Sequence, residues 1–162
     1  LPRPVQKPLP VWMTANPNAA FPKLRESALR RVARIGDGWM TTANTIESLK
    51  VNFDDIRRYG DEYGRPVTDE FEVCLYYNIH VCDDRERGLD TTAAYLKEYY
   101  GVEYDRAFLE QWVAVGDPQR CIDEVAKFAE AGATTITLRL IGHEEIEQFA
   151  RVTEQVLPAV IP

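Results

Sequence analysis

The sequence lacks any long apolar run. None of its 162 residues lies in a stretch approaching the ~20 apolar residues that a helix needs to cross a bilayer. Residues 1 to 8, Leu-Pro-Arg-Pro-Val-Gln-Lys-Pro, also lack the apolar segment of a secretory signal peptide. We therefore expect a cytoplasmic protein.

Cysteine is scarce. Cys74, Cys82 and Cys121 are the only three, and no two of them have C-x-x-C spacing. An odd count without that spacing argues against a disulfide framework and against a zinc site. Cys74 and Cys121 fall at apolar positions of an expected strand and an expected helix, so we interpret them as buried thiols rather than reactive ones.

Histidine and serine are scarcer still, with two of each: His80 and His143, Ser27 and Ser48. The histidines are isolated from any pattern of metal-binding residues, which favours structural roles and no metal. Both serines lie inside expected helices, which argues against a Ser-His-Asp hydrolase. The absence of G-x-G-x-x-G and P-loop motifs argues against dinucleotide-binding and nucleoside-triphosphate-binding folds.

The charge balance is acidic, with 26 Asp and Glu against 19 Lys and Arg and a net charge of −7. This argues against nucleic acid or an anionic membrane as the main partner and is typical of a solvated acidic surface. The length and the 45% hydrophobic content indicate one globular domain over residues 1 to 162. Four of the ten prolines lie in residues 1 to 10, which we interpret as an extended connector.

Strand and helix patterns alternate along the chain. Expected strands lie at about 10 to 15, 38 to 42, 71 to 82 and 134 to 141. Expected helices lie at about 23 to 35, 46 to 64, 84 to 99, 105 to 113, 118 to 131 and 143 to 157. The pattern predicts an α/β fold with parallel strands. A (β/α)8 barrel takes ~250 residues, so four such units match half of one.

In parallel α/β folds ligands bind where strands end. The helix that ends at Gly36 runs directly into a strand that stops at Thr41 and Thr42, so these hydroxyls are candidate ligand contacts. Alternatively, these threonines are present because threonine favours strands and caps the start of the next helix. Asn16 follows the first expected strand and either contacts a ligand or starts the turn at Pro17.

The last expected strand carries Arg139 on the same face as two threonines, so this arginine points into a barrel mouth toward an anionic substrate or phosphate, or else is a surface or salt-bridged residue. An aromatic run is formed by Tyr95, Tyr99, Tyr100 and Tyr104. The helical spacing of Tyr95 and Tyr99 favours packing over stacking on a cofactor ring.

Four segments in register resemble the bacterial luciferase-like oxidoreductases. They are Pro4 to Pro8 leading to Val11-Trp12-Met13, Arg31 to Trp39, Gly116 to Cys121, and Ala131-Gly132-Ala133 before the last strand. The family uses FMN or the deazaflavin coenzyme F420 on a TIM-barrel fold. The resemblance implies that this chain corresponds to roughly the second half of the barrel, its fifth to eighth βα units.

The resemblance also implies a site for the cofactor phosphate, made by Thr14, Ala15 and Asn16 after the fifth barrel strand and by Thr41 and Thr42 at the sixth. Family members commonly carry a Gly-Gly or Gly-Ser pair at the first of these places, where this chain has Ala15-Asn16-Pro17. The usual acid and base residues belong to the first half of the family's barrel. No catalytic residue is therefore assigned here.

Three hypotheses follow. The first is a flavin- or F420-dependent oxidoreductase or monooxygenase acting on a small organic substrate, of which this chain, starting at Leu1, is a fragment. The second is an inactive half-barrel that pairs with another copy or with an N-terminal half, because open sheet edges favour association. The third is an open, flavodoxin-like binding domain.

Overall fold

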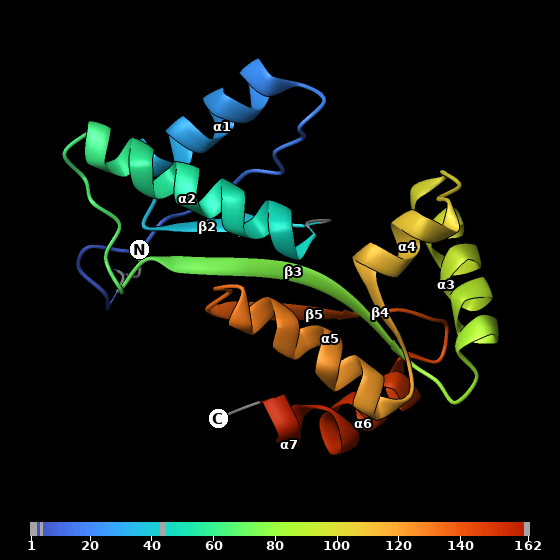
Figure 1. Cartoon of the computed structure of the whole chain (residues 1–162). Coiled ribbons are helices and arrows are strands. Elements are labelled where there is room, and N and C mark those ends of the chain that lie inside the picture. Colours follow the sequence, from blue (N-terminus) through green and yellow to red (C-terminus); the bar gives the residue numbers. More distant parts are fainter. Residues whose placement is uncertain (1–2, 4, 43–44, 161–162) are drawn as a thin grey trace.

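The computed structural model of the chain describes residue 3, residues 5 to 42 and residues 45 to 160. Strands and helices alternate along most of the chain (Figure 1). In order they are β1 (Trp12–Thr14), α1 (Pro22–Ile35), β2 (Gly38–Thr41), α2 (Ile46–Glu62), β3 (Glu72–Val81), α3 (Arg85–Tyr100), α4 (Arg106–Trp112), β4 (Val113–Gly116), α5 (Pro118–Glu130), β5 (Thr135–Leu140), α6 (Glu145–Gln155) and α7 (Leu157–Val160). No helix in these ranges is long and apolar enough to cross a membrane.

Every strand pair in the sheet is parallel. β1 pairs with β2, β2 with β3, and β3 with β5. The four strands expected from the sequence are thus neighbours in sequence order, as consecutive strands of a barrel are. A flavodoxin-like sheet, in which the first strand lies between the second and third, does not have this order.

The sequence pattern missed the short strand β4. The helix expected to end at 113 stops at Trp112, and Val113 already pairs with Asn78 of β3. β3 has ten residues whereas β2 has four, so β2 leaves the last part of β3 without a neighbour on that side. β4 fills this place, pairing with Asn78 to Val81.

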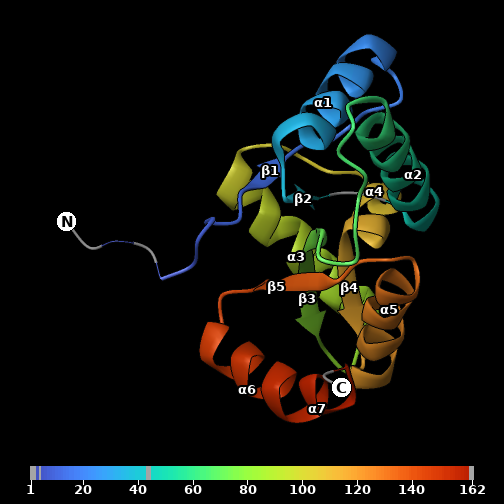
Figure 2. The same cartoon turned by 90° about the vertical axis from the view of Figure 1, so that its left-hand side faces the viewer.

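One face of the sheet packs against helices. Alternate residues of β3, from Val73 to Val81, are buried on this covered face. They form one apolar core with residues of α1, α2 and α5: Leu29, Val32, Leu49, Ile56, Val125 and Phe128. In Figure 2, α1, α2 and α5 lie on one side of the strands.

The opposite face, called the open face below, carries Cys74, Tyr76, Asn78 and His80 of β3. Paired residues of parallel strands share a face, so Val113 and Val115, the partners of Asn78 and His80, lie on it too. They belong to a second apolar core with residues of α3 and α4: Leu89, Leu96, Leu109 and Trp112. Helices α3 and α4 therefore cover the carboxyl end of the open face.

Side-chain caps and a glycine define several helix ends. Thr45, Asp84 and Asp117 cap α2, α3 and α5, each accepting a hydrogen bond from the backbone N–H three residues on. Gly36 ends α1, and a Cβ there would lie 2.8 Å from the Val32 carbonyl oxygen. The expected helix over 143 to 157 is interrupted at Val156, ahead of Pro158, whose ring cannot continue a helix interior.

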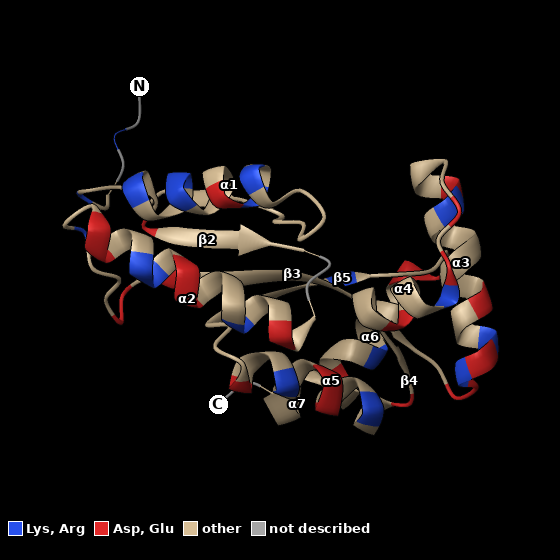
Figure 3. Ribbon diagram, turned by 45° about the horizontal axis from the view of Figure 1, so that its top comes forward, with Lys and Arg blue, Asp and Glu red and all other residues tan. Residues whose placement is uncertain are grey.

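Ion pairs join the first two helices. Figure 3 shows α1 and α2 side by side, both with acidic and basic residues. Arg25 of α1 binds Asp55 of α2 at 2.7 Å, and Arg30 of α1 binds Glu62 of α2 as well as Glu26 of its own helix. Burial opposes ionisation of Asp55, but hydrogen bonds from Arg58 and Arg25 outweigh it and lower the pKa of its carboxyl. These ion pairs thus hold α1 and α2, the helices that follow β1 and β2, against each other.

Candidate functional site

Asn16 joins the two strand exits that the sequence singled out. Its Oδ1 accepts hydrogen bonds from the backbone N–H of Thr42 at 2.9 Å and from the hydroxyl of Thr41 at 3.3 Å. A backbone N–H can only donate, so the amide oxygen must face Thr42. The Nδ2 group of Asn16 then has no hydrogen-bond partner in the described part of the chain.

The residues before Asn16 are held by strand pairing. The N–H of Ala15 donates to the Met40 carbonyl, and the Ala15 carbonyl accepts from the indole of Trp39 at 2.9 Å. The carbonyl of Thr14 accepts from Arg31. Ala15 is buried while Thr14 and Asn16 are exposed. The backbone of Ala15 is therefore committed to the fold, and Thr14 and Asn16 present their side chains to solvent.

The amino end of α1 is open to an anion. Its N-cap residue, Phe21, makes no side-chain hydrogen bond, and the first turn contains no acidic residue. Residues 15 to 21 separate it from β1, and Asn18 shapes this loop by accepting from the N–H of Ala20. Uncapped N–H groups at a helix start favour negative charge.

Trp112, which the sequence pattern did not single out, ties α4 to this region. Its indole N–H donates to the Thr42 hydroxyl at 2.9 Å. Its carbonyl accepts from Nδ2 of Asn78 at 3.2 Å. Asn78 is fully buried, and its Oδ1 has no partner in the part of the chain that the structure describes. A continuous set of hydrogen bonds thus links Thr42, α4 and the middle of β3.

Arg139 lies on the open face, as the strand pattern predicted, because it pairs with Asn78 in register. Its Nη1 donates to the Tyr100 hydroxyl at 2.9 Å, and its guanidinium carbon lies 4.1 Å from the Tyr99 ring centre. Arg139 is half-buried and forms no ion pair within the described residues.

The tyrosine run packs mainly on itself. Tyr99 and Tyr100 have ring centres 4.7 Å apart, and Tyr104 lies 5.2 Å from Trp112. The expectation of an aromatic cluster is confirmed. This cluster joins α3 to α4 and surrounds Arg139.

The histidines and cysteines are placed as structural residues. His80 is buried, with Nδ1 at 2.9 Å from the Ile141 carbonyl, and burial lowers its pKa. His143 is exposed and lies 3.4 Å from Glu98. Burial raises the pKa of the Cys121 thiol to about 12, so it stays protonated at neutral pH. Across the described ranges, no group of three His, Cys, Asp or Glu could hold a metal ion.

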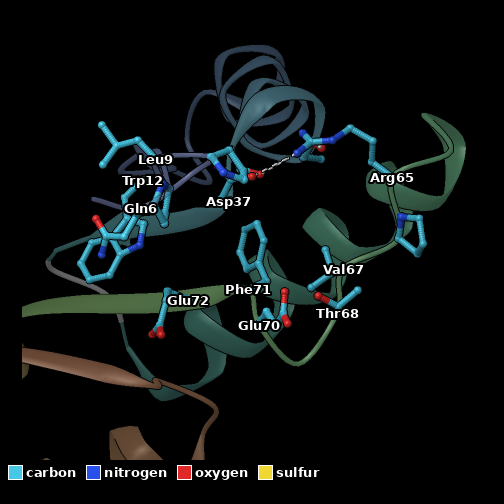
Figure 4. A pocket seen from close by; sticks show the side chains of 15 residues that line it. Gln6, Leu9, Trp12, Asp37, Arg65, Val67, Thr68, Glu70, Phe71 and Glu72 are labelled. Atoms are coloured by element: carbon cyan, nitrogen blue, oxygen red, sulfur yellow. Dashed lines mark hydrogen bonds and ion pairs between the residues drawn. The ribbon is translucent and has the colours of Figure 1, made fainter. Parts of the chain in front are cut away.

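A large cavity lies at the other end of the sheet. It has a volume of about 930 Å³ and is lined by Trp12 and Phe71, with an ion pair between Arg65 and Asp37 at its rim (Figure 4). These residues are at the amino ends of the strands. A cavity of about 450 Å³, lined by His80, lies at the carboxyl ends of β3 and β5. Chemistry in parallel α/β folds takes place at carboxyl ends, so size does not identify the site.

Comparison with known proteins supports the resemblance. The model of the luciferase-like monooxygenase family matches residues 1–135. The chain belongs to this family. Its parallel α/β sheet is that of the luciferase-like TIM-barrel proteins, and its family consists of flavin- or F420-dependent oxidoreductases.

Relatives of this luciferase-like chain are about twice as long. The F420-dependent glucose-6-phosphate dehydrogenase of Nakamurella multipartita is 26% identical over 93% of this chain and 48% of its own length. An F420-dependent secondary alcohol dehydrogenase aligns with a TM-score of 0.76 and 14% identity over 95% of this chain and 49% of its own. The F420-dependent tetrahydromethanopterin reductase of Methanopyrus kandleri aligns with a TM-score of 0.70 and 18% identity, covering 94% and 51%.

Proposed function

We propose that this chain is the second half of a (β/α)8 barrel, its fifth to eighth βα units, in an oxidoreductase or monooxygenase that uses FMN or coenzyme F420 on a small organic substrate. The sequential order of β1, β2, β3 and β5 supports this reading. So does the match to about half of each relative. On this proposal residues 1 to 162 form one unit, with residues 1 to 10 as a connector.

Apolar side chains are exposed beside both β1 and β5, which supports the proposal that a further half of the barrel packs there. β1 and β5 each have one partner strand among the described residues. Beside them, α1 exposes 70% of Leu24, and α6 exposes 87% of Ile146 and 61% of Phe149. Helices of a further βα half would pack at these two places. A second copy of the chain could occupy them too, which is the alternative of an inactive half-barrel module.

The cofactor phosphate is proposed to bind at the loop of Thr14, Ala15 and Asn16 and at Thr41 and Thr42. Ala15 contributes only its place in this loop, because its backbone N–H and carbonyl are both bonded within the fold. The single observation that carries this assignment is the orientation of Asn16, whose Oδ1 holds Thr41 and Thr42 and whose two Nδ2 hydrogens stay available to an anion. When bound, the flavin or deazaflavin supplies the hydride chemistry. This half positions its phosphate and forms part of the substrate wall through Arg139, while acid and base groups belong to the other half.

The substitution Asn16→Asp tests the assignment. Aspartate keeps an acceptor for Thr41 and Thr42 but replaces the two N–H donors with negative charge. In the protein that carries this sequence, we expect FMN or F420 affinity to fall at least tenfold in a fluorescence titration. Riboflavin, which has no phosphate, should bind equally to both forms.

The matched control is Asn18→Asp, in the same loop, where the side-chain oxygen accepts from the N–H of Ala20. It should leave FMN and F420 binding within about twofold. Equal losses in the two variants would refute the phosphate site. If neither cofactor changes the fluorescence of the wild-type protein, the oxidoreductase proposal fails and the inactive half-barrel is favoured.

The net charge of −7 supports a small-molecule substrate rather than nucleic acid or an anionic membrane. We place the protein in the cytoplasm. It is expected to work either as a homo-oligomer or joined to an N-terminal half-barrel.

A further inference from the structure

Arg139 is a partly buried cation surrounded by tyrosines. Its guanidinium carbon lies 4.1 Å from the ring centre of Tyr99, 5.5 Å from that of Tyr100 and 5.9 Å from that of Tyr95. One N–H donates to the Tyr100 hydroxyl. A second hydrogen bond goes to Tyr95, and because a guanidinium has five N–H donors, further donors remain for a ligand among the described residues.

The surroundings of Arg139 contrast with those of the chain's other half-buried arginines. Arg25 contacts Asp55 at 2.7 Å, and Arg151 contacts Asp83 at 2.6 Å. Arg139 contacts no carboxylate in the described part of the chain. Tyrosine rings attract a cation through their quadrupoles but carry no net charge. Arg139 therefore keeps an uncompensated positive charge at a partly desolvated position.

Arg139 lies near the carboxyl ends of the strands, where ligands bind in this fold. Arg139 is next to last in β5, on the open face, and its tyrosine neighbours come from the carboxyl-terminal turns of α3. Thr137, two residues earlier on the same face, is exposed, and its strand partner is Tyr76. The guanidinium thus lies between the open face of the sheet and α3, near the carboxyl ends of the strands.

We propose that Arg139 and the Tyr100 hydroxyl bind the oxyanion group, carboxylate or phosphate, of an anionic organic substrate, with the Tyr99 ring packing against its carbon skeleton. The proposal rests on the proposed function for its setting in an oxidoreductase. It makes α3, which the sequence assigned to packing, a determinant of substrate specificity.

The hydrogen bond between the two residues supports this pairing. The Tyr100 oxygen accepts from Arg139, so its own proton is left to donate to a second acceptor. A guanidinium offers several N–H groups in one plane, which suits the two oxygens of a carboxylate or those of a phosphate. Tyr99 is 63% exposed, so its ring is accessible to the rest of the substrate.

Calorimetric titration with three probes tests the proposal. Benzoate and benzamide have the same ring but differ in charge, and inorganic phosphate lacks the ring. In the wild-type protein that carries this sequence, benzoate should bind at least tenfold more tightly than benzamide. Phosphate binding tighter than benzoate binding would identify a phosphate ester as the substrate group. Equal affinity for benzoate and benzamide would overturn the proposal without any variant.

Substitutions locate the site. Arg139→Gln should lower benzoate affinity at least tenfold, Arg139→Lys less, and Tyr100→Phe about threefold to tenfold. The matched control is Arg57→Gln, because Arg57 also lies over an aromatic ring, that of Phe53 at 4.1 Å, but on α2. It should leave benzoate affinity unchanged. Benzoate binding that persists in folded Arg139→Gln would overturn the proposal.

Cofactor titration of the same samples separates the two proposals. If FMN or F420 binds and benzoate does not, the anion site is wrong and the proposed function stands. If benzoate binds in an Arg139-dependent way and neither cofactor binds, the anion site stands and the proposed function fails.

Discussion

Gln148 completes the hydrogen bonding of β3 where β5 has ended. Its side chain is buried, accepts from the N–H of Val81 at 2.9 Å and donates to the carbonyl of the same residue at 3.0 Å. Gln148→Leu should lower the free energy of unfolding by about 2 to 4 kcal/mol, because two buried backbone groups lose their partners. Urea denaturation measures this. Gln119→Leu, at an exposed residue, should change it by less than about 0.5 kcal/mol; similar losses in both would contradict the argument.

His80 makes stability depend on pH. Burial lowers its folded-state pKa below the unfolded value of about 6.5. The unfolded chain then binds more protons between the two pKa values, so stability is full above about pH 6.5 and falls as the pH drops toward the folded pKa. His80→Gln should flatten this part of the pH–stability curve, measured by urea denaturation from pH 7.5 to 5. His143→Gln, at the exposed histidine, should keep the slope; an unchanged slope in His80→Gln would show that other groups cause it.

At the scale of single residues, the sequence could predict which residues share a site but not which distant side chains form hydrogen bonds with them. The resemblance to the luciferase-like family assigned Asn16, Thr41 and Thr42 to one site, and the structure places them in hydrogen-bonding contact. The bond from Trp112 to Thr42 spans 70 residues of sequence. No local pattern encodes such a contact, because it depends on how α4 packs against the sheet.

At the scale of elements, local signals located helices well and short strands poorly. α5 begins with Asp117 as N-cap and Pro118 at the first helical position, which is a local signal that the sequence itself carries. β4 could not be found in this way. Its four residues form a strand because β3 is longer than β2 and leaves its end unpaired, which is a property of the sheet and not of the segment.

The cap of α5 gives a prediction at this scale. Asp117 accepts from the N–H of Arg120 at 3.0 Å. Asp117→Ala should cost about 1 kcal/mol and lower Tm by roughly 2 to 4 °C, followed by circular dichroism. Asp123→Ala, on the exposed face of the same helix, should leave Tm within about 1 °C. A helix start stabilised only by packing would give equal Tm values for the two variants.

At the scale of the molecule, helices cover the two faces of the sheet to different extents. The covered face holds one continuous apolar core with α1, α2 and α5, which is enough to order four βα units. The open face is packed only at its carboxyl end, by α3 and α4. Thr14, Asn16 and Thr42 lie where β1 and β2 end, and Thr42 and Arg139 are hydrogen-bonded to Trp112 and Tyr100 of this second layer. A barrel closed by a further half would enclose them together with the tyrosines, and that enclosure would remove water from both proposed sites.

The exposed edges predict how the chain behaves alone. If α6 is built to pack against another βα unit, the 162-residue chain should self-associate at micromolar concentration in sedimentation velocity. Ile146→Glu combined with Phe149→Glu should shift it toward monomer, because both apolar side chains lie on α6 at the end of the sheet. Val51→Glu is the control, since Val51 is half exposed on α2, which packs against α1 inside the helix layer. If the unsubstituted chain stays monomeric, the proposal that α6 packs against another βα unit is contradicted, because the exposed apolar residues of α6 would then be stable in water.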